Sequence, residues 1–157
     1  MESGLASMAE QKLSIKIEID THPPASADTV TVTEVITHQF LFAVRHHDLP
    51  SLMAGKVHAL CVRPYPKGRD WYDLLWYGSQ RPAVKPNLVL LQNALDQTEG
   101  VGVIDAANWN RYALQWLETF DAKKLAADVR PFLASPRDAD AITLDNLRTV
   151  ILRSIPG

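Results

Sequence analysis

The chain has 157 residues, of which 46% are hydrophobic and 22% charged, and its formal net charge is −2 at pH 7. This length suits one domain with a single core, and the near-neutral balance excludes a surface that is basic throughout. The single cysteine, Cys61, excludes an internal disulfide, and no apolar run approaches the roughly 20 residues that cross a membrane. We therefore expect one cytoplasmic domain, 1–157, without membrane contact.

The N-terminal third is predicted to form strands. Apolar and polar residues alternate strictly over 13–20, which is typical of a strand with one buried face. The other face would carry Lys16, Glu18 and Asp20, either as a solvated surface or as part of a site. Residues 29–37 are rich in Val, Ile and Thr, and 40–44 alternate, so both predict further strands. We expect a small antiparallel or mixed sheet within 12–47.

The first helix is predicted to begin at Asp48, with Pro50 in its first turn. Lys56 falls on its apolar stripe and must reach solvent along its stem or meet a partner carboxylate. Cys61, in the same helix, is expected to be a small core residue rather than a nucleophile. The residues of the stripe are Leu49, Leu52, Met53, Val57 and Leu60.

The first helix is predicted to be broken by Pro64, Pro66 and Gly68, which lie in a short basic turn. A second helix should follow this turn. Asp70 is predicted to be its N-cap, and Asp73 lies one turn further on, where the positive helix end favours acids. Taken singly, each charged residue could be only a cap, a solvated ion pair or a surface group. Together they form a candidate site of Lys56, Arg69, Asp70 and Asp73.

Periodic apolar residues predict helices throughout the rest of the chain, after Asn87, over 108–120, over 122–133 and from Ser135 onward. The expected fold is therefore α+β, with a strand region (12–47) followed by a helical bundle (48–157). The histidines show no zinc-ligand spacing. Asp138 and Asp140 have the spacing of a metal-binding pair, but they are read as routine acids at a helix start.

Three stretches resemble a known family. They are K-I-E-I-D-T-H-P-P (16–24), G-K-V-H-A-L-C-V-R (55–63) and K-G-R-D-W-Y-D-L-L-W-Y (67–77). The last two resemble the lysine and aspartate motifs of AbiEii/AbiGii-type nucleotidyltransferases, toxin components of bacterial type IV toxin–antitoxin and abortive-infection systems. The resemblance implies a partial nucleotidyltransferase-like fold.

The same resemblance implies roles for individual residues. Lys56 would contact nucleotide phosphates together with Arg69, and Asp70 and Asp20 would be catalytic acids. The supporting residues would be Asp73, Lys16 and Glu18. Nucleotidyl transfer in the family needs Mg²⁺, for which Asp20 and Asp70 are the candidate ligands here. The early Gly-Ser with its acidic pair, the first metal-binding motif of related enzymes, is absent from this sequence.

Two functions follow as hypotheses. In the first, the protein is a toxin-like transferase that moves nucleotides from GTP or another nucleoside triphosphate to RNA, with tRNA as the expected acceptor and an antitoxin as partner. This chain would be incomplete for catalysis, or further sequence would precede it. In the second, it is a non-catalytic remnant that binds nucleotide, RNA or protein. An open strand edge at 13–20 predicts a two-fold homodimer.

Overall fold

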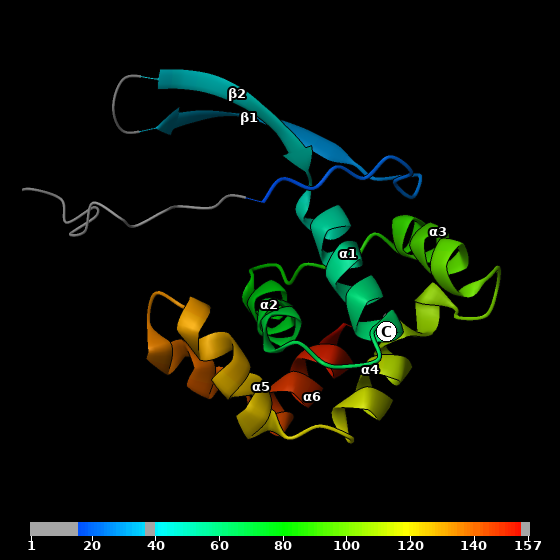
Figure 1. Cartoon of the computed structure of the whole chain (residues 1–157), viewed down its shortest axis with the longest axis vertical. Helices are drawn as coiled ribbons and strands as arrows, with labels where there is room; N and C mark the ends of the chain where they lie inside the picture. The colour runs from blue at the N-terminus through cyan, green and yellow to red at the C-terminus, as the bar shows by residue number, and fades with distance from the viewer. Residues whose placement is uncertain (1–15, 37–39, 155–157) are drawn as a thin grey trace, which may run out of the picture.

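The computed structural model describes residues 16–36 and 40–154. Most of these residues are helical, so the predicted helical bundle is confirmed (Figure 1). The α-helices are α1 (Leu49–Val62), α2 (Gly68–Ser79), α3 (Leu88–Glu99), α4 (Trp109–Leu117), α5 (Ala122–Val129) and α6 (Leu144–Arg153). Short 3-10 turns lie at η1 (Ala106–Asn108), η2 (Arg130–Phe132) and η3 (Pro136–Ala141).

Of the small sheet expected within 12–47, the described part of the chain contains two strands, close to the predicted ranges 29–37 and 40–44. Strands β1 (Thr29–Ile36) and β2 (Phe40–His47) pair only with each other, antiparallel, with Thr29 opposite His47 and Ile36 opposite Phe40. This ribbon projects from the helical body (Figure 1). An α+β domain built on a sheet was therefore a wrong prediction, since the core is made by helices.

The strand predicted over 13–20 is also wrong for its described part, because residues 16–20 have no regular secondary structure. The alternating isoleucines Ile17 and Ile19 are 82% and 83% exposed. Alternation predicts a strand only where a neighbouring strand and a core exist to receive the apolar face, and neither lies against these residues. Residues 13–15 lie outside the described ranges.

Helix α1 lies at the centre of the bundle and packs against α2, α3 and α4. It starts where the sequence predicted, and Asp48 caps it by accepting a hydrogen bond from the Ser51 backbone N–H at 2.9 Å. The predicted stripe is partly wrong, because Leu49 and Leu52 are about 40% exposed. The buried residues of α1 include Met53, Val57, Leu60 and, as predicted, Cys61.

Helix α2 begins against α5. The Gly68 N–H donates to Asp128 Oδ2 at 2.7 Å, so a side chain from α5 caps α2 from across the bundle. A Cβ on Gly68 would lie 2.1 Å from the Leu125 carbonyl oxygen, which is why glycine is required here. The predicted N-cap Asp70 is wrong: Lys67 holds the cap position, and Asp70 is buried within the first turn.

None of the helices within the described ranges combines the length and the apolar character that crossing a membrane would demand.

Candidate functional site

Lys56 reaches from α1 to two carboxylates on α2. Its Nζ lies 2.7 Å from Asp73 Oδ2 and 3.4 Å from Asp70 Oδ1. Burial lowers the pKa of this ammonium, but the attraction of the two carboxylates outweighs burial and leaves the pKa above its ordinary value. Lys56 is therefore charged at neutral pH, and the apolar stripe of α1 carries a fixed cation.

Asp70 is the anchor of this group. Its side chain is only 8% exposed, and its second oxygen accepts an ion-paired hydrogen bond from Arg63 at the end of α1. A buried carboxylate is stable only when its charge is compensated, and here Lys56 and Arg63 supply two positive charges. The arrangement fixes the position of the Lys56 head group between α1 and α2.

These residues line a pocket of about 360 Å³, which we call the Lys56 pocket. Its charged lining contains four cations and two acids, and its apolar wall comes from the end of α5 and the residues that follow. The charged residues are Lys56, Arg63, Lys67, Arg69, Asp70 and Asp73. The excess of positive charge makes this pocket attractive to anions.

Two of the cations rest on aromatic rings rather than on acids. Arg69 Cζ lies 4.7 Å from the centre of the Phe132 ring, and Lys67 Nζ lies 5.8 Å from that of Tyr65. Among the described residues, neither Lys67 nor Arg69 has a carboxylate within ion-pair distance. Their charges are thus open to a ligand, whereas those of Lys56 and Arg63 are shared with Asp70.

The structure brings together four of the residues singled out from the sequence, namely Lys56, Arg69, Asp70 and Asp73. It places Asp20 elsewhere, in a second pocket that shares no lining residue with the first. Lys16 and Glu18 pair with each other at the surface.

Sequence reasoning missed six lining residues of the Lys56 pocket, among them Arg63, Lys67 and Phe132. Arg63 lies seven residues after Lys56, about two helical turns further on, at the C-cap of α1, and this spacing could have indicated it. Lys67 lies within the basic turn that the sequence marked. Phe132 comes from a distant segment, and no local signal pointed to it.

The carboxylates of the Lys56 pocket do not fit a Mg²⁺ ion. Both oxygens of Asp70 already contact cationic nitrogens, and Asp73 is held by Lys56. Across the described ranges, the structure contains no group of three or more His, Cys, Asp or Glu side chains that could hold a metal. Magnesium prefers several free oxygen ligands in octahedral geometry, and this pocket offers a cation where the metal would lie.

Comparison with known proteins identifies the family. A family model described as the nucleotidyl transferase AbiEii toxin of the type IV TA system matches residues 3–151. The chain belongs to this family. No curated protein and no solved structure matches the chain. AbiEii proteins are nucleotidyltransferase toxins, which in general use a nucleoside triphosphate and a divalent metal and have a cognate antitoxin.

Proposed function

We propose that the Lys56 pocket binds the phosphates of a nucleoside triphosphate, GTP being the first candidate. The observation that carries this proposal is the pair of cations, Lys67 and Arg69, that lack carboxylate partners within the described residues at the mouth of the pocket. A triphosphate supplies the negative oxygens that such groups pair with, in hydrogen bonds stronger than those between neutral partners.

In this proposal each residue has its own role in phosphate binding. Asp70 and Asp73 hold Lys56 so that its ammonium faces the incoming phosphates without losing rotamer freedom on binding. Arg69 lies over the Phe132 ring, and the planar guanidinium keeps its edge donors available for a bidentate contact. Lys67 adds a mobile point charge on the other side.

We further propose that the RNA acceptor, with tRNA as the expected one, approaches over the rim of the same pocket. Tyr65 and Phe132 are 57% and 63% exposed, and each lies beside a cation. Aromatic faces flanked by positive charge are the features that hold single-stranded nucleic acid through stacking and phosphate contacts.

Turnover is a separate question from binding. Transfer in this family depends on a divalent ion, and the carboxylates here are engaged by cations. We therefore propose weak or no turnover by this polypeptide alone.

The alternative function is a non-catalytic module that uses the pocket to bind nucleotide, RNA or a protein such as the antitoxin. A two-fold homodimer stays a proposal, now through an open edge of the β1–β2 ribbon.

The test is isothermal titration of GTP, then of the other triphosphates, with Mg²⁺ present, into the wild type and into Arg69→Ala, Lys56→Ala and Lys85→Ala. Lys85 is exposed and lies outside the pocket, so its variant removes one charge without touching the site. We expect Arg69→Ala and Lys56→Ala to weaken binding roughly tenfold or more, and Lys85→Ala to leave it unchanged. Equal weakening by all three variants would mean that binding depends on the net charge of the protein and not on this pocket. Absence of binding in the wild type would refute the phosphate site.

A further inference from the structure

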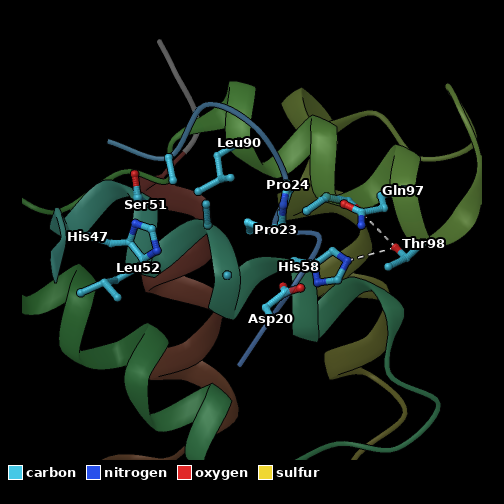
Figure 2. A pocket seen from close by; sticks show the side chains of 14 residues that line it. Asp20, Pro23, Pro24, His47, Ser51, Leu52, His58, Leu90, Gln97 and Thr98 are labelled. Atoms are coloured by element: carbon cyan, nitrogen blue, oxygen red, sulfur yellow. Dashed lines mark hydrogen bonds between the residues drawn. The ribbon is translucent and has the colours of Figure 1, made fainter. Parts of the chain in front are cut away.

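A second pocket, which we call the α1–α3 pocket, has no place in the proposed function. It has a volume of about 430 Å³ and lies between residues 20–27, α1 and α3 (Figure 2). This volume falls within the range of small-molecule sites. Much of its wall is apolar and small, including Pro23, Pro24, Ala54, Gly55 and Ala94. Side chains of this size leave room for a flat ring.

Hydrogen bonds from α3 hold the N-terminal wall in place. Asn93 Nδ2 donates to the Ala25 carbonyl oxygen at 3.0 Å, and Gln97 Nε2 donates to that of His22 at 2.9 Å. The pocket is thus built by contacts between segments about 70 residues apart in the chain, as is typical of a preformed site rather than a gap at a loose end.

Two polar groups in the pocket, Asp20 and His58, can accept hydrogen bonds from a ligand. Asp20 uses one carboxylate oxygen to accept the His22 N–H at 2.9 Å, and the described residues provide no partner for the other oxygen. His58 Nε2 lies 3.0 Å from Thr98 Oγ1, which itself lies 3.0 Å from the Ala94 carbonyl oxygen. A carbonyl only accepts, so the hydroxyl donates to it and receives the His58 Nε2–H. His58 Nδ1 is left as a bare acceptor.

Charge sets this pocket apart from the Lys56 pocket. Its described lining contains no lysine or arginine, and Asp20 is its formally charged residue. Burial lowers the pKa of His58, so this imidazole is neutral at pH 7. Phosphates and carboxylates would meet an anion and unfilled acceptors here. A ligand with a cationic N–H donor would complement both.

We propose that the α1–α3 pocket binds a small ligand made of a flat apolar ring and a protonated amine, with the amine paired to Asp20 and the ring against Ala54, Gly55 and Ala94. The site shares no lining residue with the Lys56 pocket. It is therefore a second, chemically opposite site on the other side of α1, and it does not depend on the proposed phosphate binding.

Gly55 allows a sharp test. A Cβ added there meets nothing within 4 Å, so Gly55→Leu can extend a larger side chain into the pocket from an unhindered Cβ, and Gly55→Ala is the matched control that adds only that Cβ. Tryptamine serves as the test ligand, and indole-3-acetate has a similar ring with the opposite charge. Binding is measured by titration calorimetry on the full chain, after circular dichroism has shown that each variant keeps the wild-type helical content and a thermal midpoint no lower than that of the wild type.

We expect tryptamine to bind the wild type, the single methyl of Gly55→Ala to weaken this binding by no more than about threefold, and indole-3-acetate to bind the wild type roughly tenfold more weakly or not at all. Gly55→Leu should abolish tryptamine binding, and Asp20→Asn should weaken it about tenfold, since it removes the charge but keeps the shape. Lys56→Ala should change nothing here. Absence of tryptamine binding, equal binding of the two indoles, or unchanged binding by Gly55→Leu would each overturn the proposal, whatever GTP does at the Lys56 pocket.

Discussion

Replacing two helical glycines by alanine should have opposite effects. In the interior of a helix, Gly→Ala stabilises by roughly 0.5–1 kcal/mol, because alanine loses less backbone entropy on folding. Gly55 meets this condition, since the added Cβ would find nothing within 4 Å. Gly55→Ala should therefore raise the free energy of unfolding by about that amount.

Gly68→Ala should do the reverse. Its Cβ would lie 2.1 Å from the Leu125 carbonyl oxygen and 3.1 Å from the carbonyl carbon, which are backbone atoms that no rotamer change can move. Reaching an ordinary carbon–oxygen separation of about 3.3 Å requires α5 to retreat by roughly 1.2 Å. Such overpacking costs roughly 1–3 kcal/mol, and loss of the Gly68 N–H bond to Asp128 adds about 1 kcal/mol.

The assay is urea unfolding followed by far-ultraviolet circular dichroism, with both variants measured beside the wild type. We expect a separation of roughly 2.5–5 kcal/mol between them. Because Val129, Phe132 and Leu133 line the Lys56 pocket, the same retreat of α5 should weaken GTP binding in Gly68→Ala but not in Gly55→Ala. A Gly68→Ala protein as stable as the wild type would refute the argument that α2 and α5 are in rigid backbone contact.

Three further predictions concern single side chains. Burial raises the pKa of the Cys61 thiol from 9.0 to about 12. The stabilisation that comes from keeping this thiol neutral in the fold is therefore fully present below pH 9 and is lost as the pH rises toward 12. Relative to Cys61→Ala, the wild type should lose about 1.4 kcal/mol per pH unit in this window, measured by urea unfolding; parallel curves would contradict it. Asp128→Ala should cost about 1 kcal/mol through loss of the α2 cap, while Asp128→Asn, which keeps an acceptor oxygen, should cost less; equal losses would count against the cap. Lys56→Ala should cost only about 1 kcal/mol, because Asp70 keeps Arg63 and Lys56 is 38% exposed; a collapse of the thermal midpoint would make Lys56 structural.

Local signals predicted the helices well. Asp48 begins α1 through a side-chain cap, because this effect acts within one helical turn. Cys61 is buried as its helix position indicated. The sequence also placed Lys56, Asp70 and Asp73 near one another, since a short turn joins the two helices that carry them.

Non-local contacts explain what the sequence could not predict. Asp70 is not the N-cap because Asp128, sixty residues away in sequence, accepts the Gly68 N–H instead. The alternation of residues 16–20 gives a strand only where a neighbouring strand pairs with it, and the structure describes none beside these residues. Asp20 reaches a different pocket from Lys56 because Asn93 and Gln97 of α3 hold the segment that follows it.

The β1–β2 ribbon has a consequence for how the molecule exchanges amide hydrogens. Among residues 16–36 and 40–154, no third strand pairs with the ribbon, and an isolated pair of strands is marginally stable in water. The base of the ribbon is joined to the bundle by the Asp48 N–H bond to the Asp28 carbonyl oxygen at 3.1 Å. The ribbon can therefore open while α1 stays folded, so its amides should exchange far faster than those around Met53 and Leu91 in the core. An antitoxin or a second copy that adds a strand to it would register first as slowed exchange there.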